Sequence, residues 1–375
     1  MSTMLNAISF PGRYCQGKGL LRQIGKWVAV CGKKPVVLWE PFLKDALGAM
    51  VSGSFQEHGL TFHDVLFKGE TTRAAAQALV AAIKDGGCDV VVGLGGGKAI
   101  DTAKAAAALS GARCVIVPTI ASNDAPTSAC TVWYNDAGDY EGFNMWRFNP
   151  DLILVDTEVI ARAPVRFLVA GMGDALATWP EASAAYSSRA VSTAGGTQTL
   201  TAMAMARLCF DTILRHGLEA REAVARGVVT PAVEKVVEAN ILLSGVGWES
   251  GGLATAHAIA NSLPAIHETH GLLHGEKVAF GLMTQLCLEQ DWPVEEIYRI
   301  VDFLNAVGLP TTFAAMKMQD VSKERLLEFA RSVSGEGSFV HNHAFPVAPE
   351  NIVDAMVAAD SLGQRRMNKP AGSPA

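Results

Sequence analysis

The sequence lacks the features that mark secreted and membrane-spanning proteins. Its seven cysteines are widely spaced and form no CxxC pair, so we expect reduced thiols rather than a disulfide framework. No run of about 18 consecutive apolar residues is present, so no transmembrane helix is predicted. The first ten residues show no basic segment followed by an apolar one, so no signal peptide is predicted. We therefore expect a cytoplasmic protein with no membrane partner.

Charge is also scarce. Only 18% of the residues are charged, the formal net charge is −6, and no block of lysine and arginine stands out. A nucleic-acid-binding protein needs a basic surface, so no nucleic-acid partner is expected. Hydrophobic residues, by contrast, make up 49% of 375 residues, which is enough for two domains around large cores. The composition is typical of a compact enzyme, and we expect a homo-oligomer.

The first 160 residues alternate between short apolar runs and segments with helical spacing. This alternation predicts βαβ units and a parallel sheet. Strands are expected at residues 35–39, 65–67, 89–94, 114–117 and 152–155, and helices at residues 44–57, 72–84 and 98–109. From about residue 163 onward, helical periodicity dominates. The sequence therefore predicts an α/β Rossmann-like domain over residues 1–162 and an all-α domain over residues 163–375.

Three glycines, Gly95, Gly96 and Gly97, follow the strand predicted at residues 89–94. Consecutive glycines let the backbone approach a ligand closely, and the next helix offers free N–H groups that suit a pyrophosphate. The GxGxxG pattern fails, because position 98 is lysine. The segment is interpreted either as an anion-binding loop or as a tight turn between strand and helix.

Glu40 ends the strand predicted at residues 35–39. An acidic residue at this point accepts hydrogen bonds from a ribose diol and repels a 2′-phosphate, which favours NAD over NADP. A solvated surface carboxylate fits the sequence equally well.

Four of the nine histidines fall within a short stretch: His257, His267, His270 and His274. A catalytic metal needs about three protein ligands and a position left open for substrate. Asp174 lies in an apolar segment of small residues, where a buried carboxylate must be paired, ligating or capping a helix. These residues are candidate ligands, although the spacing does not choose among the histidines.

The distance between His257 and His274 is a constraint on any shared metal. On one straight helix, 17 residues span about 25 Å, so the chain must fold back between them. Pro264 and Gly271 favour such a break.

Several motifs together resemble a known family. They are GGGK at residues 95–98, DTAK at 101–104, PTIAS at 118–122, GDA at 173–175, SGVGWESGG at 244–252 and HGEKVA at 274–279. They are similar to those of the glycerol dehydrogenase branch of the iron-containing alcohol dehydrogenase superfamily, over roughly residues 8–366. The resemblance implies the dehydroquinate synthase-like fold of iron-type alcohol dehydrogenases. It also implies NAD-dependent, metal-assisted oxidation of a small vicinal polyol, with glycerol to dihydroxyacetone as the best guess.

The resemblance implies that Asp174, His257 and His274 hold the metal. Iron-type members have another histidine four residues after the aspartate, where this chain has Thr178. The expected divalent metal is therefore zinc. In this view the domain over residues 163–375 binds metal and substrate, and residues 1–162 bind the dinucleotide.

The resemblance adds further site residues to Glu40 and the three glycines. The expected cofactor-binding residues are Glu40, Gly95, Gly96, Gly97, Lys98, Thr119, Ser122, Ser128, Cys130 and Tyr134. Asp124 matches a residue that hydrogen-bonds the polyol, and Trp248 stands where phenylalanine is common near the substrate pocket. Asp124 and His270 are the expected catalytic residues. A proton relay through His270 and an ordinary polar lining role fit equally well.

Two alternative functions stay open. Residues 132–138 look more like a related branch that reduces 2-oxo acids, and a hydroxycarboxylate dehydrogenase needs a cation for the substrate carboxylate, for which Arg147 is the nearby candidate. A dehydroquinate-synthase-like lyase needs several basic residues for a phosphate or phosphonate. Residues 257–277 offer only Lys277 for that purpose.

Overall fold

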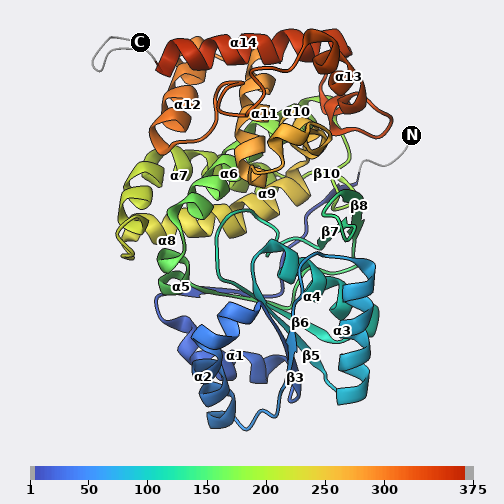
Figure 1. Cartoon of the computed structure of the whole chain (residues 1–375), viewed down its shortest axis with the longest axis vertical. Coiled ribbons are helices and arrows are strands. Elements are labelled where there is room, and N and C mark those ends of the chain that lie inside the picture. Colours follow the sequence, from blue (N-terminus) through green and yellow to red (C-terminus); the bar gives the residue numbers. More distant parts are fainter. Residues whose placement is uncertain (1–4, 368–375) are drawn as a thin grey trace. The chain divides into compact units, whose positions relative to one another are not determined.

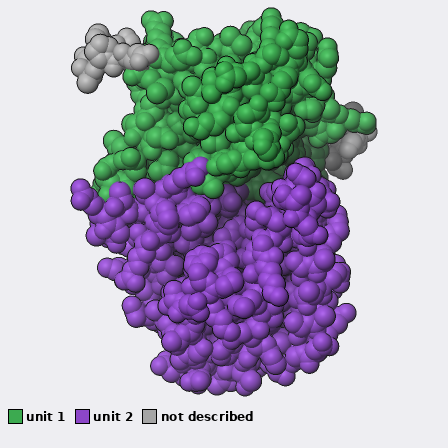
Figure 2. All heavy atoms as spheres, viewed as in Figure 1, with its two compact units in different colours: residues 1–8, 169–222, 246–375 green, residues 9–168, 223–245 purple. Residues whose placement is uncertain are grey.

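A computed structural model describes residues 5–367, and the chain divides into two compact units. The first, here called the α/β unit, comprises residues 9–168 and 223–245. The second, here called the helical unit, comprises residues 5–8, 169–222 and 246–367 among those described (Figure 2). Both units are therefore discontinuous in sequence, whereas the sequence suggested one boundary near residue 162.

A single boundary would place two segments in the wrong unit: residues 223–245 belong to the α/β unit, and residues 5–8 belong to the helical unit. Pairings between particular residues explain both assignments. Helix α8 (Pro231–Glu238) carries Glu234, which accepts hydrogen bonds from Gln16 and Thr157 of the α/β unit. Strand β1 (Asn6–Ala7) pairs in parallel with β10 (Thr197–Gln198) of the helical unit. These contacts join residues far apart in sequence, so hydrophobic periodicity does not reveal them.

The α/β unit is built on a six-stranded parallel sheet with the order β2-β9-β6-β5-β3-β4. Strands β3, β5 and β6 of this sheet are labelled in Figure 1. The strands are β2 (Tyr14–Gly17), β3 (Pro35–Trp39), β4 (His63–Leu66), β5 (Val90–Gly95), β6 (Arg113–Pro118) and β9 (Leu152–Asp156). The predicted parallel sheet is confirmed. The short edge strand β2 was not predicted, nor was the antiparallel hairpin of β7 (Cys130–Tyr134) and β8 (Tyr140–Met145).

Helices cover both faces of this sheet, because successive strand residues point to opposite sides. Val37 and Val92 face a core with α1 and α2, whereas Val36 and Val91 face a core with α3 and α4. The helices are α1 (Ile24–Cys31), α2 (Pro41–Glu57), α3 (Arg73–Gly86), α4 (Gly97–Ser110) and α5 (Thr157–Arg162). Helix α2 begins earlier than predicted, because Pro41 suits the first helical position and follows the extended residue Glu40.

The helical unit is almost entirely α-helix, as predicted. The helices that lie wholly or mostly in it are α6 (Val165–Ser188), α7 (Leu200–Val224), α9 (Ser244–Gly251), α10 (Thr255–Ser262), α11 (His274–Leu288), α12 (Val294–Val307), α13 (Lys323–Val333) and α14 (Pro349–Met367). One hydrophobic core joins α10, α11, α13 and α14 through Ile259, Phe280, Phe329 and Met356. Over the described residues, no helix is both long and apolar enough to cross a membrane.

Candidate functional site

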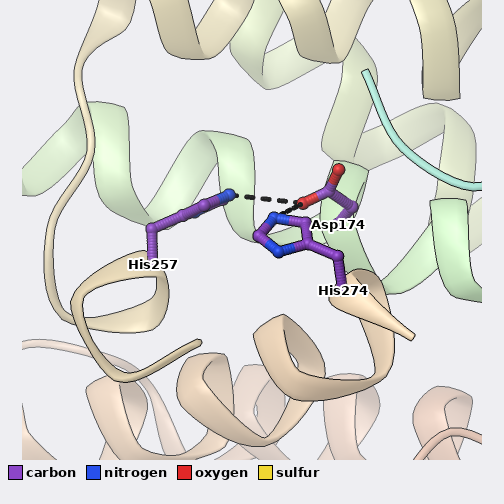
Figure 3. A group of neighbouring side chains, drawn as sticks. All are labelled: Asp174, His257 and His274. Atoms are coloured by element: carbon purple, nitrogen blue, oxygen red, sulfur yellow. Dashed lines mark ion pairs between the residues drawn. The ribbon is translucent and has the colours of Figure 1, made fainter. Parts of the chain in front are cut away.

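Asp174, His257 and His274 meet in the helical unit, where one oxygen of Asp174 pairs with both imidazoles (Figure 3). Asp174 Oδ1 lies 3.3 Å from His257 Nε2 and 3.4 Å from His274 Nε2. In a tetrahedral site with bonds of about 2.0–2.1 Å, neighbouring ligand atoms lie about 3.3–3.4 Å apart. Both oxygens of Asp174 are buried and accept no hydrogen bond within the described chain. The residues therefore fit a divalent metal ion.

The chain folds back between the two histidines, as the sequence required. Helix α10 carries His257 and ends at Ser262, and two short 3₁₀ turns follow it, one of which contains Pro264. His274 is then the first residue of α11. His257 is buried, whereas the His274 side chain is 39% exposed, so the site is open on the His274 side.

Charge holds the three side chains together. Burial opposes ionisation of Asp174, but the imidazoles of His274 and His257 outweigh it and hold the pKa of this carboxyl well below its usual range. Burial also opposes protonation of His257, yet Glu181 and Asp174 raise the pKa of its imidazole well above the ordinary value. Because a metal binds only deprotonated imidazole, a metal ion and a proton compete for His257 Nε2.

Glu181 is a site residue that the sequence analysis missed. It is fully buried on α6, and its Oε2 lies 2.5 Å from His257 Nδ1. Asp174 and Glu181 are seven residues apart on one helix, about two turns, so both point to the same side. Pro180 falls between them, but α6 continues through it. The only signal in the sequence was this spacing.

A second buried pair, Glu289 and His343, lies in the same unit. His343 Nδ1 is 3.3 Å from Glu289 Oε1, and His343 Nε2 is 2.7 Å from the Thr255 hydroxyl, at the start of α10. Burial raises the pKa of Glu289 to about 7 and lowers the pKa of His343 to about 4. At a pH between these two pKa values both side chains are therefore mostly uncharged.

The glycine turn lies in the α/β unit, where the order of strands reverses between β3 and β5. Ligands of open α/β sheets bind at such a switch point, beyond the carboxyl ends of the strands. Glu40 follows β3, and its Oε1 accepts a hydrogen bond of 3.0 Å from the Gly96 N–H. The structure thus brings Glu40 together with the glycine turn of Gly95, Gly96 and Gly97.

Lys98 lies on the first turn of α4. Its ammonium group is 2.5 Å from Glu70 Oε1 and 5.5 Å from the centre of the Tyr134 ring. Burial raises the pKa of Tyr134 to about 12, so the phenol is neutral. The predicted residues Lys98 and Tyr134 are therefore neighbours, and Lys98 is paired with Glu70.

Residues 119–129 form a loop between β6 and β7 that, together with Cys130 at the start of β7, carries the other predicted contacts. Thr119 donates its N–H to the Gly95 carbonyl, which ties the loop to the glycine turn. Asp124 accepts a hydrogen bond of 2.6 Å from the Ser244 hydroxyl. Ser128 near the end of the loop and Cys130 at the start of β7 are buried, and Ser122 is partly buried.

The ammonium group of Lys104 on α4 holds this loop through two backbone carbonyl oxygens. It donates to the carbonyl oxygens of Ala125, at 2.7 Å, and Ser128, at 3.3 Å, and pairs with Asp101 at 2.8 Å. Burial raises the pKa of Asp101, and the neighbouring Lys104 opposes this rise. The DTAK motif therefore supplies a buried anchor for the loop that contains Asp124.

Trp248 and His270, both in the helical unit, differ in their surroundings. The Trp248 indole N–H is buried and has no acceptor in the described part of the chain. His270 is exposed, with Nε2 2.7 Å from the Pro264 carbonyl oxygen and its ring 4.8 Å from that of His267. These contacts of His270 do not reach the metal cluster.

The residues that the alternative functions need are poorly placed. The Arg147 guanidinium is exposed and stacks on Phe148, 5.0 Å from the ring centre. Lys277 is buried in α11, and burial lowers its pKa. Neither cation is a ready anchor for a carboxylate or a phosphate group.

Comparison with known proteins gives a consistent set of relatives. The family described as iron-containing alcohol dehydrogenase matches residues 11–157. A glycerol dehydrogenase of Citrobacter freundii is 45% identical over 362 residues, covering 96% of this chain and 99% of that protein. A glycerol dehydrogenase of Thermotoga maritima is 43% identical, covering 97% and 100%. The crystal structure of glycerol dehydrogenase from Schizosaccharomyces pombe has a TM-score of 0.94 at 37% identity, covering 99% of this chain and 94% of that one.

Proposed function

Because the chain belongs to the glycerol dehydrogenase branch of the iron-containing alcohol dehydrogenase family, we propose that it oxidises a small vicinal polyol with NAD. The first assignment is glycerol to dihydroxyacetone, since relatives that span nearly the whole chain carry the name glycerol dehydrogenase. Residues of the α/β unit bind the dinucleotide in this proposal, with Asp124 as an added substrate contact, and residues of the helical unit bind metal and substrate.

The observation that carries the proposal is the geometry of Asp174, His257 and His274. Their ligand atoms lie within 4.8 Å of one another, and the two distances from Asp174 Oδ1 match the edge of a zinc tetrahedron. Thr178 offers no fourth nitrogen ligand, and it packs so close to Gly247 that a Cβ there would lie 2.5 Å from its methyl group. Three ligands with one position left for substrate favour zinc.

In the reaction, the metal and the nicotinamide supply the chemistry, and residues of the chain hold the substrate in place. When bound, the divalent metal acts as a Lewis acid on the alcohol hydroxyl and the nicotinamide accepts a hydride. Asp124 holds a second hydroxyl of the polyol, and Ser244 fixes the Asp124 carboxylate through their 2.6 Å hydrogen bond. The Trp248 N–H, which is buried without an acceptor in the described chain, donates to a substrate oxygen.

The cofactor preference in this proposal comes from Glu40. Its carboxylate reaches the glycine turn, where it accepts from the ribose diol of NAD and repels a 2′-phosphate. Gly97, Lys98, Thr119 and Ser122 contact the cofactor, and Ser128, Cys130 and Tyr134 line its nicotinamide end. A proton relay through His270, the cytoplasmic location and the homo-oligomeric state remain predictions.

A substrate panel tests the proposal. NAD reduction is followed with glycerol, 1,2-propanediol, lactate and 2-hydroxybutyrate, before and after treatment with a strong chelator. We expect activity with the two diols, loss of that activity on chelation, and recovery when zinc is added back. Activity with the hydroxy acids alone would refute the polyol assignment, and chelator-insensitive activity would refute the role of the metal.

A further inference from the structure

The first turn of α10 is capped by side chains from other helices. A helix begins with four N–H groups that lack partners within the helix, and Ala254, which precedes α10, has no side chain that accepts them. Glu181 Oε1 on α6 accepts from Ala254 N and from His257 N, each at 2.8 Å. Gln285 Oε1 on α11 accepts from Ala256 N at 3.0 Å. The turn that carries His257 is thereby fixed to its two neighbouring helices.

The second oxygen of Glu181 binds the imidazole of the same residue. Oε2 lies 2.5 Å from His257 Nδ1, so this nitrogen carries a hydrogen and donates it to the carboxylate. In a neutral imidazole the other nitrogen, Nε2, then keeps its lone pair. His257 Nε2 is the atom that lies 3.3 Å from Asp174 Oδ1. One carboxylate therefore controls both the backbone and the ring of a candidate metal ligand.

We propose that Glu181 is a positioning residue for the metal: it selects Nε2 of His257 as the ligand atom and fixes that atom toward Asp174. This inference rests on the proposed function, because it requires a metal ion bound by His257. Partners beyond the ligating residues that hold a histidine in one tautomer typically change metal affinity by 10–100-fold when they are removed.

The proposed role requires both accepting oxygens of the Glu181 carboxylate. Glu181 meets three donors, the N–H groups of Ala254 and His257 and the Nδ1–H of His257, with two accepting oxygens. Glutamine has the same size but only one accepting oxygen, and its NH2 group only donates. If the amide oxygen keeps the two backbone donors, the NH2 faces Nδ1 and favours the tautomer that places a hydrogen on Nε2. If the amide turns over, two backbone donors face the NH2.

The test compares Glu181→Gln and Glu181→Asp with the wild type and with a control, Asp360→Asn. Asp360 on α14 is another carboxylate of the helical unit that accepts a backbone N–H, from Phe313 at 2.7 Å, and its second oxygen accepts from the Gln364 side chain. Zinc affinity is measured by competition with a chelator of known affinity, and thermal stability is measured on the metal-free proteins. We expect Glu181→Gln to weaken zinc binding by 10–100-fold, Glu181→Asp to weaken it less, and Asp360→Asn to leave it within about threefold.

A measurement on the wild-type chain covers the case in which Glu181→Gln does not fold. Nitrogen NMR of labelled histidine in the zinc-loaded protein reports which ring nitrogen binds the metal, with the His257 signals assigned from a His257→Asn variant. We expect a protonated Nδ1 and a metal-bound Nε2 at His257. Metal bound through Nδ1, or unchanged zinc affinity in a folded Glu181→Gln, would overturn the inference and leave the polyol activity standing. A wild type that binds no zinc at these residues would overturn the proposed function itself.

Discussion

Gly275 approaches Ala170 so closely that a Cβ atom on Gly275 would lie 1.8 Å from the Ala170 carbonyl oxygen. A second contact between the same two helices is also tight, since a Cβ on Gly173 would lie 2.4 Å from the Gly275 carbonyl oxygen. Each glycine is next to a candidate metal ligand, Gly173 to Asp174 and Gly275 to His274. The absence of two side chains therefore lets α6 and α11 bring their ligands together.

The substitution Gly275→Ala tests this packing. The added methyl group must push α11 away from α6, because backbone rather than a flexible side chain blocks it. Overpacking of this kind costs about 1–3 kcal/mol, and the metal ligands separate as well. We expect a lower melting temperature together with loss of bound zinc. Gly271→Ala, where a Cβ meets nothing within 4 Å, is the control and should keep both properties. Unchanged zinc binding in Gly275→Ala would contradict this reading.

The buried pair of Asp101 and Lys104 gives a second prediction. Lys104→Met removes the donors that hold the Ala125 and Ser128 carbonyls and leaves the Asp101 carboxylate buried without its cation. Breaking a buried pair on one side costs about 3–5 kcal/mol. Denaturant unfolding should show a loss of this order. The double variant Asp101→Asn with Lys104→Met should recover part of it, whereas strictly additive losses would argue against a coupled pair.

Glu40 should control the choice of cofactor. Its carboxylate accepts a hydrogen bond of 3.0 Å from Gly96 N at the switch point of the sheet, where we propose that the adenosine ribose binds. Glu40→Gln removes the negative charge that repels a 2′-phosphate and weakens the acceptor for the ribose diol. We expect the ratio of kcat/KM for NAD to that for NADP to fall by about tenfold, a change of about 1.4 kcal/mol. A ratio that stays the same would show that Glu40 does not meet the ribose.

Glu289 and His343 should give opposite dependences of stability on pH. The pKa of Glu289 is raised from 4.5 to about 7, so its contribution is full below pH 4.5 and is lost as the pH rises through 7. The pKa of His343 is lowered from 6.5 to about 4, so its contribution is present above pH 6.5 and is lost as the pH falls through 4. Between these limits the two effects largely cancel.

Variants separate the two effects. The free energy of unfolding is measured from about pH 5 to pH 7 with chelator present, and the wild-type curve is subtracted. His343→Asn should become relatively more stable as the pH falls, and Glu289→Gln relatively less stable, by up to about 1.4 kcal/mol per pH unit. Parallel curves for the two variants would show that these groups do not titrate as a buried, nearly neutral pair.

Much of the α/β unit was readable from the sequence because its strands are short, apolar and buried on both faces. Residues 35–39 and the strand before the glycine turn lie where they were predicted. Strand β2 was missed because it lies at the edge of the sheet, where its residues are only half buried. The grouping of residues 223–245 with this unit was missed because it depends on contacts such as Gln16 with Glu234, which local patterns do not encode.

The candidate site was predictable only in part. The resemblance picked out His257 and His274 among four neighbouring histidines, whereas their spacing alone did not. The role of Glu181 could not be predicted from the sequence, because it depends on contact with His257, 76 positions later. The role suggested for His270 gained no support, since its imidazole is exposed and binds a backbone carbonyl oxygen.

Metal content measured beside turnover tests the metal site most directly. Wild type, His257→Ala and His267→Ala are loaded with zinc, dialysed, and analysed for bound metal and for glycerol oxidation with NAD. We expect about one zinc ion per chain and full activity in the wild type and in His267→Ala, whose imidazole is exposed and contacts His270. His257→Ala should lose both metal and turnover. Full retention of both in His257→Ala would contradict a metal site built from Asp174, His257 and His274.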